Sequence, residues 1–258
     1  MSQQIILNGR QSNIAPNEPL RINRMARFVP PNINGLMQTD VAINGLTRRP
    51  TLAGCVLDLP LYLTTKQASP FKSVDNNAHS CTVTGATWTP QGRTFDGNDK
   101  IVTAASASLA VNTGSFELWF KGSEAGQTGA RIADIWTSGS HNIEILVYPA
   151  NTLSFAVRKN YTAIVDLQEA ITITRWHHVV GTWNVSGAYL HVDGVEEGSV
   201  VGDKRATLTT PIVSIGVRGD ESEVWFKGTV GDVLVYNRAL ASSEIQHNYL
   251  ATKWRYSG

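Results

Sequence analysis

The stretch WHHVVGTWNVSGAYLHVDGV, residues 176–195, decides the fold of this 258-residue chain. It contains two short apolar runs separated by turn-forming residues. Because successive strand side chains point to opposite faces, Trp176 and Val180 are expected on one face and His177 and Val179 on the other. Asp193-Gly194, between two apolar runs, is typical of a tight hairpin turn. The stretch therefore predicts neighbouring antiparallel strands.

The same pattern of short apolar segments separated by turn residues continues on both sides of this stretch, from about Thr51 onward. Phe116, Leu118 and Phe120 alternate with Glu117 and Trp119, as expected for a half-buried strand. Many short strands with close turns favour a sandwich or a barrel. Strands are expected at 55–61, 81–84, 100–103, 115–120, 131–136, 142–148, 152–157, 162–165, 177–182, 188–192, 212–217, 223–227 and 232–236.

One helix is expected from Ala241 to about Ala251, where Ile245 and Tyr249 are spaced four apart on one face. It would cover an open end of the sandwich. Lys253 and Arg255 would lie beyond its end, where positive charge favours the helix dipole.

Residues 1–50 differ from the rest because five prolines interrupt them and no apolar period is sustained. We expect an extended arm with one short strand near Ile5–Leu7. Six arginines against Glu18 and Asp40 give the arm a net charge of +4. This positive charge either keeps the arm soluble or binds it to an acidic surface of a partner. In the second case the candidate partner-binding residues are Arg21, Arg24 and Arg27.

Composition limits the function classes. Hydrophobic residues make up 42% and charged residues 17%, enough for a sizeable core. The net charge of +1 does not provide the concentrated positive field of a nucleic-acid-binding protein. No run approaches the 18 apolar residues of a membrane span, and the start has no signal-peptide pattern, so synthesis in a cytoplasm is expected. Cys55 and Cys81 form no CxxC motif, and two free thiols are favoured over a disulfide.

Four passages resemble the laminin-G-like family of the concanavalin-A-like lectin/glucanase superfamily. They are LDLPL at 57–61 with GATWTP at 85–90, GRTFDGNDKI at 92–101, WHHVVGTW at 176–183 with LHVDGV at 190–195, and FKGTVGDVLVYNRAL at 226–240 with Glu244-Ile245. The resemblance covers residues 53–252. It implies an all-β fold, a two-sheet antiparallel jelly-roll sandwich over residues 51–258, with the extended N-terminal arm at 1–50 and one short C-terminal helix.

The resemblance also implies a structural calcium site, for which Asp96, Asp99 and Asp232 match acidic positions of the family. Calcium takes six to eight oxygen ligands, so these carboxylates would need carbonyl and water ligands as well. The alternative is that the aspartates bond their own backbone in turns. No cofactor is required.

Sugar binding would need an aromatic side chain beside amide or carboxylate groups. We expect such ligand-binding residues on the concave sheet, with core packing as the alternative for the tryptophans. The candidates are Trp136, His141, Asn142, Tyr148 and Trp225.

Catalysis is not expected. A glycoside hydrolase needs two carboxylates facing one cleft, and Glu117 and Glu144 each stand alone in their strands. His177 and His178 are adjacent in a strand, so they point to opposite faces and cannot share a site.

These features predict a non-catalytic structural or interaction protein. The leading hypothesis is a virion component (a capsid decoration, fibre or tail-associated protein), anchored by its arm, assembled with protein partners as a homo-oligomer and displaying a lectin-like sandwich. A carbohydrate-binding adhesion module is the alternative, and a glycoside hydrolase is a remote one. No nucleic-acid partner and no membrane insertion are expected.

Overall fold

A computed structural model describes residues 4–7, 10–13, 52–138, 140–221 and 224–256. Contacts divide the chain into two units, Met1–Thr39 and Asp40–Gly258. In the first unit, β1 (Gln4–Leu7) pairs with β2 (Arg10–Asn13) as an antiparallel hairpin, so a strand lies at the position predicted near Ile5–Leu7. The three candidate arm arginines, Arg21, Arg24 and Arg27, and the boundary at residue 50 lie outside the described residues.

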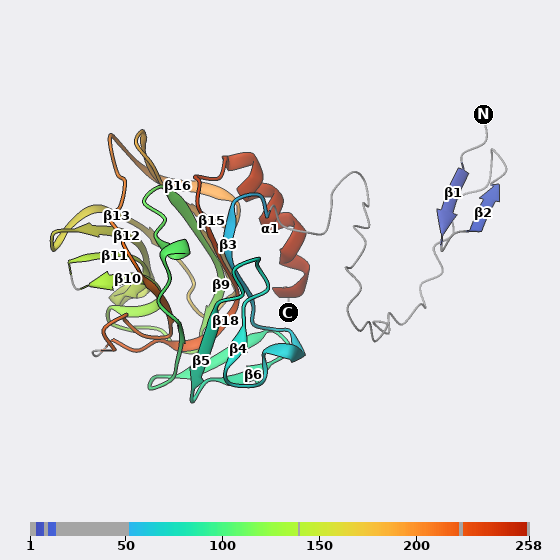
Figure 1. Cartoon of the computed structure of the whole chain (residues 1–258), viewed down its shortest axis with the longest axis horizontal. Helices are drawn as coiled ribbons and strands as arrows, with labels where there is room; N and C mark the ends of the chain where they lie inside the picture. Colours follow the sequence, from blue (N-terminus) through green and yellow to red (C-terminus); the bar gives the residue numbers. More distant parts are fainter. Residues whose placement is uncertain (1–3, 8–9, 14–51, 139, 222–223, 257–258) are drawn as a thin grey trace. The chain divides into compact units, whose positions relative to one another are not determined.

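Two eight-stranded sheets form a sandwich in the second unit (Figure 1). The first sheet has the order β13 (Thr162–Ala170), β12 (Thr152–Lys159), β11 (His141–Tyr148), β10 (Ala130–Ser138), β17 (Ile212–Ile215), β8 (Lys100–Thr103), β5 (Ser80–Thr84), β4 (Phe71–Lys72). The second has the order β16 (Val195–Val201), β15 (Gly187–Val192), β14 (His177–Trp183), β9 (Gly114–Gly122), β18 (Lys227–Tyr236), β7 (Gly92–Asp96), β6 (Thr87–Thr89), and β3 (Cys55–Pro60) pairs with β18. All these strand pairs are antiparallel, which confirms the predicted fold class.

The quoted stretch forms the predicted hairpins. β14 pairs with β15, and β15 pairs with β16 through the two-residue turn Asp193-Gly194. Both turn residues have positive φ, 52° and 83°, as a type I′ turn requires. Short 3-10 turns at Thr64–Lys66, Ala107–Leu109 and Pro149–Asn151 connect other strands.

Alternate side chains of each central strand fill the space between the sheets. Phe116, Leu118 and Phe120 of β9 are fully buried there, as their alternation predicted. Across the interface, Phe155 of β12 packs against the backbone of Gly181 on β14, where no side chain would fit. The ring of Phe155 therefore occupies the space that a side chain at position 181 would need, and the two sheets pack closely at this point.

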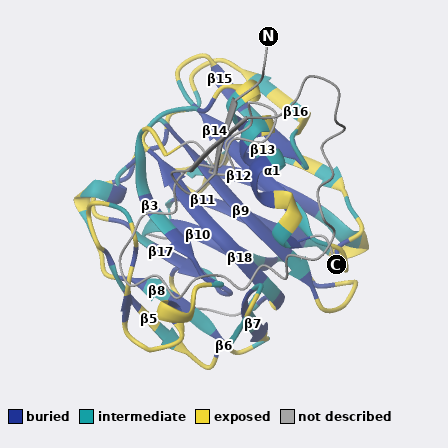
Figure 2. Cartoon of the chain, turned by 90° about the vertical axis from the view of Figure 1, so that its right-hand side faces the viewer, coloured by how far each residue is buried: buried dark blue, intermediate teal, exposed yellow. Residues whose placement is uncertain are grey.

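The helix α1 (Ser242–Tyr256) is five residues longer at its C-terminal end than predicted. It lies on the outer face of the second sheet and contacts β14 and β16, so it does not cover an end of the sandwich (Figure 2). Its last turn continues because Thr252 and Tyr256 are buried against that sheet. Lys253 and Arg255 consequently lie inside the last turn.

Most predicted strands are present, and most of them are longer than predicted by one to five residues at an end. The strand predicted at 100–103 has those bounds in the structure, and those predicted at 55–61 and 212–217 end one and two residues earlier. The strand expected at 223–227 is wrong: Trp225 makes only an isolated bridge to Arg131, and β18 begins at Lys227. Strands β2, β4, β6, β7 and β16 were not predicted. No helix in the described part of the chain is long and apolar enough to cross a membrane.

Candidate functional site

The outer face of the first sheet carries a set of charged and amide side chains, which we call the polar face: Arg131, Asp134, Asn142, Glu144 and Arg158. Their position follows from strand alternation, because the intervening residues Ile143, Ile145 and Val157 point into the core. The register places Asp134 opposite Glu144 and Trp136 opposite Asn142 on β10 and β11, and Arg158 of β12 opposite Asn142.

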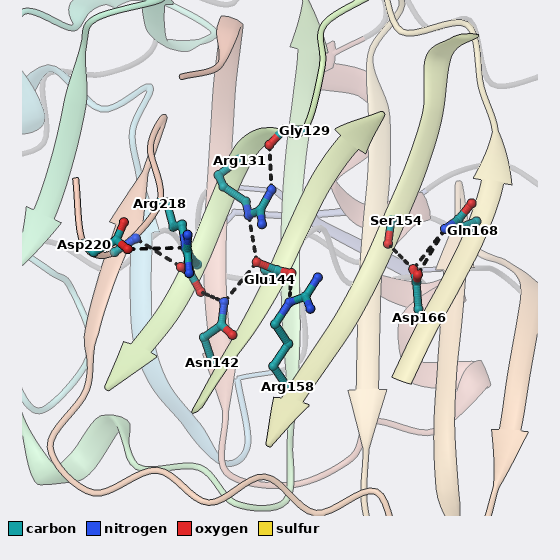
Figure 3. Close-up of polar contacts among 12 residues, drawn as sticks. Gly129, Arg131, Asn142, Glu144, Ser154, Arg158, Asp166, Gln168, Arg218 and Asp220 are labelled. Carbon is teal, nitrogen blue, oxygen red and sulfur yellow. Dashed lines mark hydrogen bonds and ion pairs between the residues drawn. The ribbon is translucent and has the colours of Figure 1, made fainter. Parts of the chain in front are cut away.

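Glu144 is the centre of the polar face and is fully buried. Its carboxylate accepts hydrogen bonds from Arg131 Nε at 2.7 Å, Arg158 Nε at 2.7 Å and Asn142 Nδ2 at 2.9 Å (Figure 3). Two guanidinium groups offset the cost of burying this charge. Each arginine uses its Nε for Glu144, and in the described part of the chain Arg158 makes no further side-chain hydrogen bond. The terminal amino groups of Arg158 are free to donate to a ligand.

Asp134 is the second buried carboxyl of the polar face. It accepts hydrogen bonds from Asn142 Nδ2 at 3.1 Å and from the backbone N–H of Gly219 at 3.1 Å. Burial, and next the negative charge of Glu144, raise the pKa of Asp134 to about 7. Asn142 thus bridges two carboxyls, donating to both.

The loop at 216–221 closes one end of the polar face. Gly219 lies directly on Trp136, and a Cβ at this position would come within 2.2 Å of the Cβ of Trp136. Arg218 and Asp220 of this loop form an ion pair at 3.6 Å. At the other side of the face, Ser154 Oγ donates to Asp166 Oδ1 at 2.7 Å, and Gln168 donates to the same carboxylate (Figure 3). These contacts on β12 and β13 form a second polar group on the same sheet, and no drawn contact joins it to the hydrogen bonds of Glu144 (Figure 3).

The structure brings together only part of the predicted ligand-binding set. Asn142 lies in the polar face, and Trp136 and Trp225 lie beside it. Trp136 is opposite Asn142 in the strand register and contacts Gly219, and Trp225 forms an isolated bridge to Arg131. Tyr148 shares the face of Asn142 but stands six residues further along β11. His141 bonds Ser140 Oγ at 2.8 Å at the start of that strand.

Sequence reasoning missed Arg131, Asp134 and Arg158 and treated Glu144 as an isolated carboxylate. The available signal was the placement of charged residues at alternate positions of strongly apolar strands. A charge at an outward position of such a strand indicates a partner on the neighbouring strand, because an unpaired charge at a buried position is costly.

The three candidate calcium ligands do not form one cluster. Asp99 Oδ2 accepts from the backbone N–H of Asp96, and Asp96 Oδ1 accepts from that of Asn98, as in an ordinary turn. Asp232 instead accepts from Arg255 and from the hydroxyl of Tyr256, both at 2.9 Å. Among the described residues no group of three or more His, Cys, Asp or Glu could hold a metal ion. A structural calcium ion, predicted on Asp96, Asp99 and Asp232, stays a prediction.

The other residues considered for chemistry have structural partners. His177 bonds Asp193 and His178 bonds Glu117, so the two histidines occupy separate environments. Cys55 and Cys81 are both free thiols, and burial raises the pKa of Cys81 to about 12. A thiol with a raised pKa is a weak nucleophile at neutral pH.

Two antiparallel sheets packed face to face define the class of protein as a β-sandwich. Residues 95–246 match the family model of the concanavalin A-like lectin/glucanases superfamily. The chain belongs to this superfamily, and the resemblance seen in its sequence is confirmed.

Solved structures share this fold at low sequence identity. Domain 4 of AbnA, a GH43 extracellular arabinanase from Geobacillus stearothermophilus in complex with arabinotriose, matches with a TM-score of 0.62 and 14% identity over 76% of this chain and 98% of that domain. A sialidase of Trypanosoma rangeli in complex with sialic acid matches with 0.62 and 19% over 81% of this chain and 34% of the sialidase. The binding domain of botulinum neurotoxin DC in complex with SialylT matches with 0.59 and 12% over 77% and 51%.

The chain thus spans nearly all of the arabinanase domain but about a third of the sialidase. These likenesses show the fold alone. No curated protein sequence matches the chain.

Proposed function

We propose that the chain is a non-catalytic glycan-binding module that contacts a saccharide through the polar face. The main support for this proposal is that the carboxylate of Glu144 accepts a hydrogen bond from the Nε of Arg131 and from that of Arg158. These two bonds hold the guanidinium groups side by side. This leaves guanidinium N–H groups to donate to hydroxyl or carboxylate oxygens of a sugar. Planar guanidinium groups with fixed orientation are suited to such recognition.

The same hydrogen bonds argue against hydrolysis. A general acid or nucleophile must reach the substrate, and a glycosidase needs two such carboxyls across one cleft. Glu144 is fully buried and accepts from three side chains, and Asp134 is fully buried and accepts from two groups. Neither carboxyl is presented to a substrate. The absence of β-glucan turnover is therefore part of the proposal.

Support for a glycan as the ligand also comes from proteins of the same fold, which were solved with arabinotriose, sialic acid or SialylT. The saccharides are ligands of those proteins. Because they are all glycans, a glycan array is the appropriate first screen for this chain.

The test compares the full chain with Arg158→Ala on a glycan array, followed by calorimetric titration of the best binder. Arg158→Ala removes the proposed donor but leaves Glu144 bonded to Arg131 and Asn142, and we expect affinity to fall at least about tenfold. Lys159→Ala is the matched control, because it removes the same charge from the next residue of β12, whose side chain points to the opposite face. Equal affinity of Arg158→Ala and Lys159→Ala, or no binding across the array, would refute the proposal.

A second proposal concerns where the module works. The basic, proline-interrupted segment of residues 1–50, with a net charge of +4, supports anchoring of the chain in an assembly, and we assign it to a virion as a decoration, fibre or tail-associated protein. Replacing Arg21, Arg24 and Arg27 together by Glu should abolish incorporation into particles. Normal incorporation of this variant would refute the assembly role while leaving glycan binding untouched.

A further inference from the structure

A cavity of about 520 Å³ lies on the second sheet, on the side opposite to the polar face, beside the C-terminal half of α1. Five aromatic side chains line it, and we call it the aromatic groove: Trp119, Trp176, Tyr249, Trp254 and Tyr256. They come from β9, from the residue before β14 and from three positions of α1. Such a volume is in the range of small-molecule binding sites.

The floor of the aromatic groove is rigid. Trp119 and Tyr256 are each only 3% exposed, and their rings stack with centroids 4.5 Å apart. Their polar atoms are bonded inside the protein, Trp119 Nε1 to Thr252 Oγ1 at 2.9 Å and the Tyr256 hydroxyl to Asp232 at 2.9 Å. The floor therefore offers ring carbons to a ligand and no hydrogen-bonding group.

The walls of the aromatic groove are more exposed than its floor, and they offer the ring of Trp254 and the indole N–H of Trp176. Trp254 is 53% exposed, and its Nε1 donates to the carbonyl of Ala251, which fixes the orientation of the ring. Trp176 packs against Tyr256 with centroids 4.7 Å apart. In the described part of the chain the Nε1 of Trp176 makes no hydrogen bond, so it can donate to a ligand.

The edge of the aromatic groove is polar. Asp193, in the β15–β16 turn, has both carboxylate oxygens anchored, one by His177 Nδ1 and one by the backbone N–H of His178, each at 2.9 Å. Each oxygen keeps a lone pair, so the carboxylate is a preoriented acceptor. On the other side Lys253 Nζ lies 5.3 Å from the centre of the Tyr249 ring.

We propose that the aromatic groove binds the ring of a saccharide, as a second site separate from the polar face. A pyranose or furanose ring has an apolar C–H face, which packs on aromatic rings, and a rim of hydroxyl groups, which both donate and accept. Asp193 as acceptor with Trp176 and Lys253 as donors meets both needs. A quaternary ammonium ligand does not fit as well, because the ammonium of Lys253 already occupies the face of Tyr249 and would repel it.

The experiment measures saturation-transfer NMR of the full-length chain with a panel of methyl glycosides of glucose, galactose, mannose, arabinose and N-acetylglucosamine. We expect transfer to the ring C–H protons of at least one glycoside. Trp254→Ala should weaken that binding at least tenfold, and Trp176→Phe, which keeps the ring but removes the N–H, should weaken it severalfold. Tyr161→Ala is the control, because it removes an even more exposed aromatic side chain, 79% exposed, from the turn between β12 and β13 of the other sheet.

Retained binding in both Trp254→Ala and Trp176→Phe would overturn the inference, and so would silence across the panel. The two sites are separable by the same assay. Binding that depends on Arg158 but not on Trp254 refutes only the aromatic groove, and binding that depends on Trp254 but not on Arg158 refutes only the polar face. Association of the chain with itself or a protein through the groove, with no glycoside signal, would also count against the inference.

Discussion

Glu117 on β9 accepts a hydrogen bond from His178 on β14, with Oε1 and Nε2 2.9 Å apart, beneath helix α1. The other carboxylate oxygen accepts from the Tyr236 hydroxyl at 3.1 Å and from Asn248 Nδ2 of the helix at 2.9 Å. All four residues are at most 1% exposed. One carboxylate on β9 thus connects β14, β18 and the helix, although the outward face of a strand would ordinarily meet water.

Glu117→Ala should therefore be strongly destabilising. It removes the common acceptor of three buried donors, and His178 would be left with neither ring nitrogen bonded, since its Nδ1 already makes no hydrogen bond. We expect the free energy of unfolding to fall by about 3 kcal/mol. Urea unfolding followed by tryptophan fluorescence measures the change. Glu197→Ala, at an exposed position of β16, is the control and should change it by less than about 0.5 kcal/mol. Equal stability of the two variants would contradict the role of Glu117.

Gly181→Ala tests the packing between the sheets. An added Cβ would lie 2.2 Å from Cδ2 of Phe155, so either the ring or β14 must move. We expect a loss of about 1–3 kcal/mol, the usual cost of overpacking a core. Gly198→Ala is the matched control in the same sheet, because its Cβ would meet Leu167 at an ordinary 3.7 Å. That change should be neutral or stabilise by about 0.5 kcal/mol, since alanine is favoured over glycine inside a strand. Thermal unfolding distinguishes the two, and a Gly181→Ala variant as stable as the parent would refute the close contact.

The sequence predicted the central strands well because their patterns are set by the core. In β9, β11 and β14, alternate residues must be apolar to fill the space between the sheets, and this requirement is visible in the sequence. Asp193-Gly194 likewise identified a hairpin through local chemistry alone. Strand β16 was missed because it lies at a sheet edge with exposed residues such as Glu196 and Glu197, and its pairing depends on its neighbour.

The sites were harder to predict because their members meet only through tertiary contacts. Glu144 and Arg158 belong to different strands, and only the register of β11 on β12 places them together. The aromatic groove joins Trp119 to residues of α1 more than a hundred positions away, and the helix was expected at an end of the sandwich. Nothing in a local pattern distinguishes these aromatic side chains from core residues.

Ala241→Ser should stabilise the start of α1. Half of a capping box is already present, since Glu244 Oε2 accepts from the backbone N–H of Ala241 at 2.9 Å. The N–H of Glu244 already donates to the carbonyl of Ala241 at 2.9 Å, and a serine hydroxyl at position 241 would give it a second acceptor and complete the reciprocal pair. We expect a gain of about 1 kcal/mol in the free energy of unfolding. Ala241→Val, which cannot accept this bond, is the control, and an equal effect of both substitutions would exclude capping as the cause.

The stability of the fold should decrease as the pH rises from about 4 to about 7. Burial raises the pKa of Asp134 to about 7 and, with the charge of Asp232 as the next cause, also raises that of Asp58 to about 7. In this range the folded chain holds protons that the unfolded chain has released, so unfolding becomes more favourable as the pH rises. One such carboxyl contributes a slope of up to about 1.4 kcal/mol per pH unit.

Asp134→Asn removes one of these titrating groups while retaining an oxygen that can accept from Gly219. Urea unfolding at pH 4.5, 5.5, 6.5 and 7.5, in buffers of equal ionic strength, should therefore show a flatter pH dependence for Asp134→Asn than for the parent, with the largest gain in stability at the highest pH. Parallel curves for the two proteins would mean that Asp134 is ionised in the folded state throughout this range. In that case Asn142 and the N–H of Gly219, together with Arg131, would suffice to stabilise two adjacent carboxylates in the polar face.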